Sequence, residues 1–430
     1  MIVLVVLGAL LVLALLTLVH WYLWRRLVRD VSAPGGRWRR TGTVLAVVLP
    51  LLSVGALVGG RAFPIAVERW FAWPGYLWLA VLLYLLLGLA VGELARPLLL
   101  RLPSRATRAA AVPDVPASDA PTADTRTSDE PGVNEPGVNE PGSDEPAAPA
   151  VQAAPSPERR LFVARAVAIG ASGAAAAVVG TGMYGVLRGP RLKQVTVPLA
   201  KLPAGAHGYR IAVVSDIHLG PILGRAHTQR IVDTINAAKP DLITIVGDLV
   251  DGTVPELGRD AEPLAQLRAR DGAYFVTGNH EYFSGAAPWV DFVRELGVHP
   301  LQNARVELGG FDLAGVNDIA GEREGDGPDF GRALGDRDPA RTAVLLSHQP
   351  VTIHDAVRHG VDLQLSGHTH GGQLWPGNFV AELANPTVAG LARYGDTQLY
   401  VTRGAGAWGP PVRVGAPSDI TLVTLASLRA

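Results

Sequence analysis

Long apolar runs dominate the first hundred residues of the chain. Ile2–Trp24 is nearly unbroken Val, Leu and Ala, and Val44–Gly60 and Pro74–Gly92 have the same character. A membrane-spanning helix needs about 20 apolar residues, so the first run is long enough alone and the third needs its flanks. Tryptophans near the ends of the runs suit the membrane–water interface. The pattern predicts a membrane region with three transmembrane helices over residues 1–102.

The arginines between these runs predict their orientation. The loop after the first run is rich in Arg, whereas the loop after the second contains only Arg61 and Arg69. Loops rich in positive charge stay in the cytoplasm, so the first loop is predicted to be cytoplasmic and the N-terminus external. The runs contain no acid or base that suggests a translocation path, apart from Glu93 near an end. Anchoring is therefore favoured over transport or sensing.

Residues 103–158 break the apolar pattern. They are rich in Pro, Ala, Ser and acidic residues, and they cannot bury enough apolar surface to fold, so we predict a disordered linker. A fourth apolar run, Leu161–Leu187, follows within the segment 159–188 and is preceded by Arg159 and Arg160. It is predicted to be a fourth transmembrane helix or a twin-arginine-like signal anchor, with cleavage left open. Either form sends the rest of the chain to the extracytoplasmic face of the cell membrane.

Residues 190–430 have a different pattern, in which short apolar runs alternate with amphipathic stretches. This alternation is typical of an α/β domain. Thr228–Ala238 and Pro288–Leu296 are predicted helices. The predicted strands are RIAVVS, DLITIV, AYFVTG, DLAGV, TAVLLS, DLQLSG, LYVTRG and ITLVTL.

Composition then narrows the chemistry. The formal net charge is −1, which gives no general electrostatic reason to expect a nucleic-acid partner. The chain contains no cysteine, so disulfides, thiolate catalysis and Cys-ligated zinc are excluded. Carboxylates, amides, hydroxyls and imidazoles remain as candidate functional groups.

Polar clusters follow five of the predicted strands. They are Asp216-Ile217-His218, Gly247-Asp248-Leu249-Val250-Asp251, Gly278-Asn279-His280-Glu281, Ser347-His348-Gln349-Pro350 and Gly367-His368-Thr369-His370. Ligands of open α/β sheets bind beyond the carboxyl ends of strands, so we expect these clusters to converge on one edge. Mixed oxygen and imidazole ligands suit manganese, iron or zinc better than calcium.

In this order the five clusters resemble the motifs of the calcineurin-like metallophosphoesterase superfamily. SGHTHGGQ followed by YVTRGAGAWGPPVRVGAPSDITLVTL is similar to its membrane-associated bacterial branch. The resemblance covers roughly residues 195–428. It implies an α/β fold in which a metallophosphoesterase β-sandwich is flanked by helices (α/β/β/α), here preceded by transmembrane α-helices.

The resemblance also implies a site for two divalent metal ions, with manganese, iron and zinc as candidates. The implied ligands are Asp216, His218 and His370 for the first ion, Asn279, His348 and His368 for the second, and Asp248 as the bridge. His280 would be catalytic, either protonating the leaving group or stabilising the transition state. Asp251 would set the orientation of His280.

Other polar residues allow two interpretations each. Glu281 is either a hydrogen-bond acceptor behind the ligands or a helix-start carboxylate, and Asp318 either supports the site or lies in a turn. Arg403 and Arg413 either contact phosphate or form structural ion pairs. The remaining histidines are predicted to lie outside the site: His207, His227, His299, His354 and His359.

These features predict a membrane-anchored phosphoesterase that hydrolyses phosphodiester, phosphomonoester or pyrophosphate bonds through a metal-activated hydroxide. Membrane tethering favours a cell-envelope or lipid-linked phosphate as substrate, and soluble nucleotides remain an alternative. The competing prediction is a catalytically silent, membrane-anchored metal-binding scaffold or regulatory domain. A silent domain has no chemical need for both the ligand positions and His280, which counts against that alternative.

Overall fold

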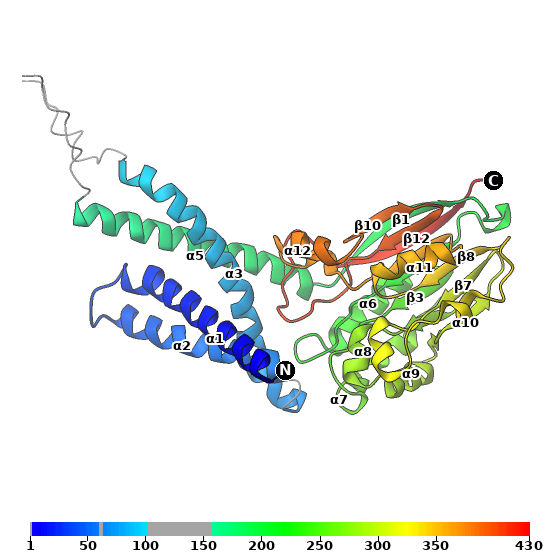
Figure 1. The fold of residues 1–430 in the computed structure, drawn as a ribbon, viewed down its shortest axis with the longest axis horizontal. Coiled ribbons are helices and arrows are strands. Elements are labelled where there is room, and N and C mark those ends of the chain that lie inside the picture. Colours follow the sequence, from blue (N-terminus) through cyan, green and yellow to red (C-terminus); the bar gives the residue numbers. More distant parts are fainter. Residues whose placement is uncertain (1, 60–62, 102–155) are drawn as a thin grey trace, which may run out of the picture.

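The computed structural model describes residues 2–59, 63–101 and 156–430. The predicted linker lies outside the described residues, apart from its C-terminal end. Apolar helices form one part of the molecule and an α/β domain forms the other (Figure 1). The helices are α1 (Ile2–Trp24), continued by the π-helical turn η1 (Arg25–Arg29), α2 (Arg37–Gly59), α3 (Ile65–Arg101) and α5 (Pro157–Leu187). All four are long and apolar enough to cross a membrane.

Two of the predicted spans are longer than the hydrophobic pattern indicates. The second helix begins at Arg37 rather than Val44, and the third runs from Ile65 to Arg101 through both Pro74 and Pro97. The third apolar run needs its flanks to span a membrane, and α3 includes residues on both sides of it. The start of this helix contacts the α/β domain, because Ile65 lies in the hydrophobic core of that domain. Hydropathy alone does not detect such a contact.

Small residues let the membrane helices pack closely. A Cβ atom at Gly75 of α3 would collide with the backbone of Leu52 in α2, and one at Gly92 would collide with Val167 of α5. Close backbone approach at small residues is the usual way in which helices associate in a bilayer. At the end of the bundle away from the domain, Arg26 pairs with Glu93 at 3.1 Å.

Two six-stranded sheets form the centre of the α/β domain. The first sheet has the order β1 (Arg191–Leu199), β12 (Asp419–Ser427), β2 (Arg210–Val214), β3 (Leu242–Val246), β4 (Ala273–Val276) and β5 (His299–Pro300). The second has the order β10 (Gly390–Tyr394), β11 (Thr397–Val401), β9 (Leu363–Ser366), β8 (Thr342–Leu346), β7 (Phe311–Gly315) and β6 (Ala304–Glu307). Strands β2, β3 and β4 are parallel neighbours, as are β7, β8 and β9.

Helices cover the outer face of each sheet (Figure 1). The first sheet is covered by α6 (Arg225–Ala238), α7 (Val254–Ala261) and α9 (Ala286–Glu295), and the second by α10 (Phe330–Leu334) and α11 (Ile353–Arg358). Along β2, Ile211 and Val213 face the interior of the sandwich, while Ala212 and Val214 pack beneath the helices. Successive side chains of a strand point to opposite faces of the sheet, and here both faces are buried. The predicted α/β/β/α sandwich is confirmed.

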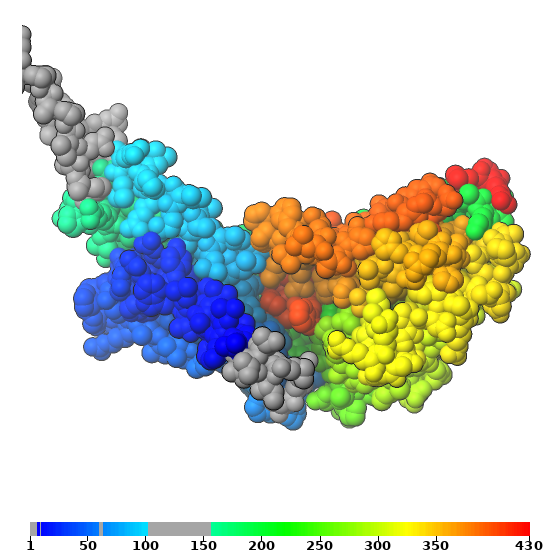
Figure 2. All heavy atoms as spheres, in the orientation of Figure 1, coloured from blue at the N-terminus to red at the C-terminus, as the bar shows by residue number. Residues whose placement is uncertain are grey.

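Short elements complete the domain. They are α8 (Asn279–Ser284), α12 (Gly377–Ala384) and the 3₁₀ turns η2 (Ala204–Ala206), η3 (Glu262–Gln266), η4 (Ile319–Glu324), η5 (Pro350–Thr352) and η6 (His370–Gly372). Helices α2 and α3, in blue and cyan, lie against the α/β domain, in green to red (Figure 2). There the hydroxyl of Tyr84 donates a 2.9 Å hydrogen bond to the carbonyl of Trp375. Val186 of α5 packs against Leu223 and Ala407. The membrane helices and the domain therefore make direct contact.

Candidate metal centre

Each predicted ligand lies just beyond the carboxyl end of a strand. Asp216 and His218 follow β2, Asp248 follows β3, Asn279 follows β4, His348 follows β8, and His368 and His370 follow β9. The first three strands are neighbours in one sheet and the last two are neighbours in the other. The ligands therefore converge on one edge of the sandwich, with both sheets contributing.

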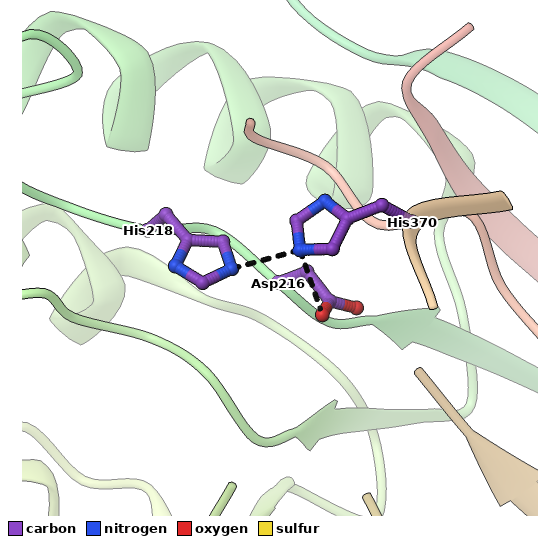
Figure 3. Close-up of side chains that lie close together, drawn as sticks. All are labelled: Asp216, His218 and His370. Atoms are coloured by element: carbon purple, nitrogen blue, oxygen red, sulfur yellow. Dashed lines mark hydrogen bonds and ion pairs between the residues drawn. The ribbon is translucent and has the colours of Figure 1, made fainter. Parts of the chain in front are cut away.

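The first group of side chains contains Asp216, His218 and His370 (Figure 3). The Nε2 atoms of the two histidines are 2.9 Å apart, and Nε2 of His370 is 3.4 Å from Oδ1 of Asp216. All three residues are buried. Three ligand atoms of mixed oxygen and nitrogen type therefore face one small volume.

The second group contains Asp248, His348 and His368, with Asn279 beside it. Oδ2 of Asp248 is 3.0 Å from Nε2 of His348 and 3.9 Å from Nε2 of His218, which belongs to the first group. Nδ1 of His368 is 3.0 Å from Oδ1 of Asn279. Asp248 therefore lies between the two groups, where a bridging carboxylate would have to be.

Hydrogen bonds behind two of the histidines prepare them to bind a cation. Nδ1 of His218 donates to Oδ1 of Asp251 at 2.8 Å, and Nδ1 of His348 donates to the carbonyl of Val246 at 2.8 Å. When either ring is neutral its single proton is on Nδ1, and Nε2 then presents a lone pair to the centre. Nε2 of His348 is buried and faces Oδ2 of Asp248 at 3.0 Å, without the geometry of a hydrogen bond. This donor set fits a metal ion.

The charges of the centre also favour cation binding. Burial alone would raise the pKa of Asp248, but the nearby imidazoles, chiefly that of His348, hold it far below its usual value. Burial, and then the charge of His348, lowers the pKa of His368 to about 4. Burial, and then the charge of Arg413, holds the pKa of His370 well below its usual value. Asp248 is therefore ionised and these two imidazoles are neutral at neutral pH, as metal ligands must be.

His280 and Asp251 form a pair beside the two groups. Nδ1 of His280 is 2.7 Å from the same Asp251 oxygen that His218 contacts. Burial alone would lower the pKa of His280, but the hydrogen bond and charge of Asp251 raise it to about 9. Burial would raise the pKa of Asp251, but His218 and then His280 lower it to about 2. The structure thus places a protonated imidazole next to the centre and fixes its orientation.

The backbone at the site is strained. Among the described residues, Asp216, His218, Asp248, His368 and His370 all have positive φ, between 50° and 72°. This left-handed region is unfavourable for residues that carry a Cβ atom, and such residues gather at functional sites. The strain turns each side chain from its strand end back toward the common centre.

The structure shows the surroundings of Glu281 and Asp318, the two acidic residues for which the sequence allowed two interpretations each. The carboxylate of Glu281 accepts hydrogen bonds from the N–H groups of Asp248, Leu249 and Gly278, so it supports the ligand loops and also lies in the first turn of α8. Asp318 accepts from the side chain of Gln349 at 2.9 Å and caps η4. Both acids hold the loops that carry ligands, and both also have the local role that the alternative interpretation gave them.

Arg413 has a role that neither interpretation included. It is buried and donates to the carbonyls of Gly406, Arg403 and His370, so it ties together the loops behind the centre. Its Nη2 also lies 3.0 Å from Nδ1 of His370. A guanidinium only donates, so in this arrangement the proton of His370 is on Nε2. Metal binding through Nε2 would require that proton to leave and this contact to change.

Comparisons with known proteins agree with this geometry. The calcineurin-like phosphoesterase family model matches residues 209–372. An uncharacterized metallophosphoesterase of Aquifex aeolicus is 35% identical over 240 residues, which cover 55% of this chain and 91% of that protein. The chain belongs to the calcineurin-like metallophosphoesterase family. Members of this family generally bind divalent metals, and the two ligand groups are the candidate positions for them here.

Other relatives connect the domain to membranes. A transmembrane protein with metallophosphoesterase domain from Danio rerio is 38% identical over 258 residues, covering 57% of this chain and 59% of that protein. The chain spans 59–66% of the length of the relatives that share 38% identity with it. Among solved structures, a dimetal phosphatase from Danio rerio aligns with a TM-score of 0.34 and 12% identity, over 50% of this chain and 91% of that one. The apolar helices and the transmembrane relatives together indicate a membrane protein.

Proposed function

We propose that this chain is a membrane-anchored, two-metal phosphoesterase. The convergence of seven ligand side chains beside the His280–Asp251 pair carries this proposal. Asp216, His218 and His370 would hold one ion, Asn279, His348 and His368 would hold the second, and Asp248 would be shared between the two. Metal ions bound there would supply activation of water and stabilisation of negative charge on the phosphoryl oxygens.

The reaction is hydrolysis of a phosphodiester, phosphomonoester or pyrophosphate bond. Water adds its oxygen to phosphorus and releases one proton to solvent as the bond from phosphorus to the leaving oxygen breaks. His280 donates a proton to the leaving oxygen, and Asp251 keeps the His280 ring charged and correctly turned. A silent metal-binding scaffold would not need this pair.

The experiment that tests the function uses the full chain purified in detergent. After metal removal by chelation it is expected to be inactive on bis(p-nitrophenyl) phosphate and p-nitrophenyl phosphate, because no water is activated. Mn²⁺, Fe²⁺ or Zn²⁺ is expected to restore turnover, with two ions bound per chain by elemental analysis. A folded protein that binds two ions but hydrolyses neither ester would favour the scaffold instead.

We further propose that the domain of residues 190–430 lies on the extracytoplasmic face, with residues 1–102 and 159–188 as the membrane anchor of a multi-pass protein. The C-terminal end of α2, the N-terminal end of α3 and the C-terminal end of α5 all meet the domain. Arg26 and Arg165 lie at the opposite end of the bundle. The positive-inside rule places that arginine-rich end in the cytoplasm. Cell-envelope or lipid-linked phosphates are then the accessible substrates.

Orientation can be tested by labelling, because the chain contains no cysteine of its own. Asp396→Cys, on the exposed β10–β11 turn, is expected to react with a membrane-impermeant maleimide in intact bacterial cells. Ala33→Cys, in the α1–α2 loop, is expected to react only after the cells are opened. The reverse pattern would place the catalytic domain in the cytoplasm.

A further inference from the structure

A cavity of about 460 Å³ connects the candidate centre with the membrane helices. His218, Asp251 and His280 line one side of it. Another part of its wall is formed by Ala56 and Leu57 of α2 and by Glu68, Tyr76 and Leu79 of α3. A substrate bound at the centre would therefore contact the membrane region as well as the α/β domain.

This wall is fixed to the domain. Ile65 at the start of α3 is buried in the core cluster that contains Val250 and Leu257. The hydroxyl of Tyr76 donates a 2.7 Å hydrogen bond to the carbonyl of Ala56, which joins the ends of the two helices. The wall is therefore part of the folded structure.

One side of the cavity continues onto the lipid-facing surface of α2. Leu57 lines the cavity and is nevertheless 59% exposed, and its neighbour Val58 is 56% exposed. Exposed apolar residues on a membrane helix face acyl chains. A molecule in the bilayer can therefore place its apolar part along α2 while its polar part reaches the cavity.

Glu68 gives this cavity a chemical preference. The residue is 4% exposed and lines the cavity, and within the described ranges its carboxylate makes no hydrogen bond or ion pair. An ionised carboxylate at a buried position is unfavourable unless it is paired, and a cationic group of a ligand in the cavity would supply that partner. Glu256 lines the same cavity, and no lysine or arginine among the described residues does so. The charge of the wall is complementary to a cation.

Building on the proposed function, we infer that the substrate is a membrane phospholipid with a cationic head group. Its phosphate lies at the metal centre, its ammonium group pairs with Glu68, and its acyl chains leave along Leu57. Glu68 is then a specificity-determining residue contributed by the membrane region. The transmembrane helices complete the substrate site as well as anchoring it.

The test compares phosphatidylethanolamine with phosphatidylglycerol, each in detergent micelles, using the full metal-loaded chain. Wild type is expected to prefer the ethanolamine lipid. Glu68→Gln is expected to lower that preference about tenfold, the usual effect of losing one charge-assisted hydrogen bond. Glu93→Gln, on the same helix but paired with Arg26 and Arg96, is the matched control and is expected to keep the preference.

A second pair of variants tests the path of the acyl chains without touching the carboxylate. Leu57→Trp narrows the mouth of the cavity and is expected to reduce lipid hydrolysis relative to that of bis(p-nitrophenyl) phosphate. Val58→Trp, equally exposed but outside the cavity lining, is expected to leave the ratio unchanged.

The possible failures are distinguishable. If wild type hydrolyses no ester with any metal, the proposed function fails. If it hydrolyses bis(p-nitrophenyl) phosphate but neither lipid, or if Glu68→Gln leaves the lipid preference unchanged, only the inference about the cationic phospholipid is overturned.

Discussion

Replacing Asp248 with asparagine is expected to lower the metal-dependent rate on the order of 10³-fold, the effect of removing a central electrostatic group from an active site. Oδ2 of Asp248 lies between His348 and His218, which belong to different ligand groups. Asparagine has nearly the same shape and keeps an oxygen for the N–H of His280, which now donates to Oδ1 of Asp248. The substitution therefore removes the charge while preserving the position of the loop.

The measurement is kcat on bis(p-nitrophenyl) phosphate at saturating Mn²⁺, together with the number of ions bound per chain. We expect fewer than two ions in Asp248→Asn, because two cations held close together need a shared carboxylate to offset their repulsion. Asp291→Asn is the matched control, since Asp291 is exposed and pairs only with Arg294 in the part of the chain that the structure describes. An Asp248→Asn protein with two ions and full activity would exclude the bridging role.

The sequence predicted the strands of the domain well where both of their faces are buried. All eight predicted runs are strands, among them β2, β3 and β8, whose residues are almost all inaccessible to solvent. The strands that were not predicted are β1, β5, β6 and β10. Strand β5 has only two residues, and β1 and β10 are edge strands with many exposed positions. Strands with many exposed positions have a weak hydrophobic pattern, so the local sequence does not predict them.

The side chains of the centre were predictable because each one follows a strand end with its own local motif. The wall contributed by α3 was not predictable in this way. Glu68 lies in the segment between the second and third apolar runs, and it is buried where the start of α3 meets the α/β domain. The core cluster there joins Ile65 to Val250 and Leu257, which are far away in the chain. The charge network of Arg413 behind His370 has the same origin. Contacts between distant segments leave no periodic signal.

Replacing His280 with alanine is expected to slow the hydrolysis of different substrates by amounts that depend on their leaving group. A general acid contributes about 10²–10⁴-fold to a rate when the leaving oxygen needs a proton. The pair with Asp251 keeps the His280 imidazole protonated, with a pKa of about 9, so it can supply that proton at neutral pH. The kcat/KM of His280→Ala for an alkyl phosphodiester is therefore expected to fall by about 10²–10⁴-fold.

For a nitrophenyl ester, kcat/KM is expected to fall much less in His280→Ala, because nitrophenolate is a stable anion that leaves without protonation. The informative measurement is thus the ratio of kcat/KM for methyl p-nitrophenyl phosphate to that for glycerophosphoethanolamine in His280→Ala and in wild type. His354→Ala is the control, since His354 is an exposed residue of α11 whose ring lies beside Tyr394. A large change of the ratio assigns proton donation to His280. Equal losses on both esters would instead assign it to stabilising charge on the phosphoryl oxygens, because that contribution does not depend on which oxygen departs.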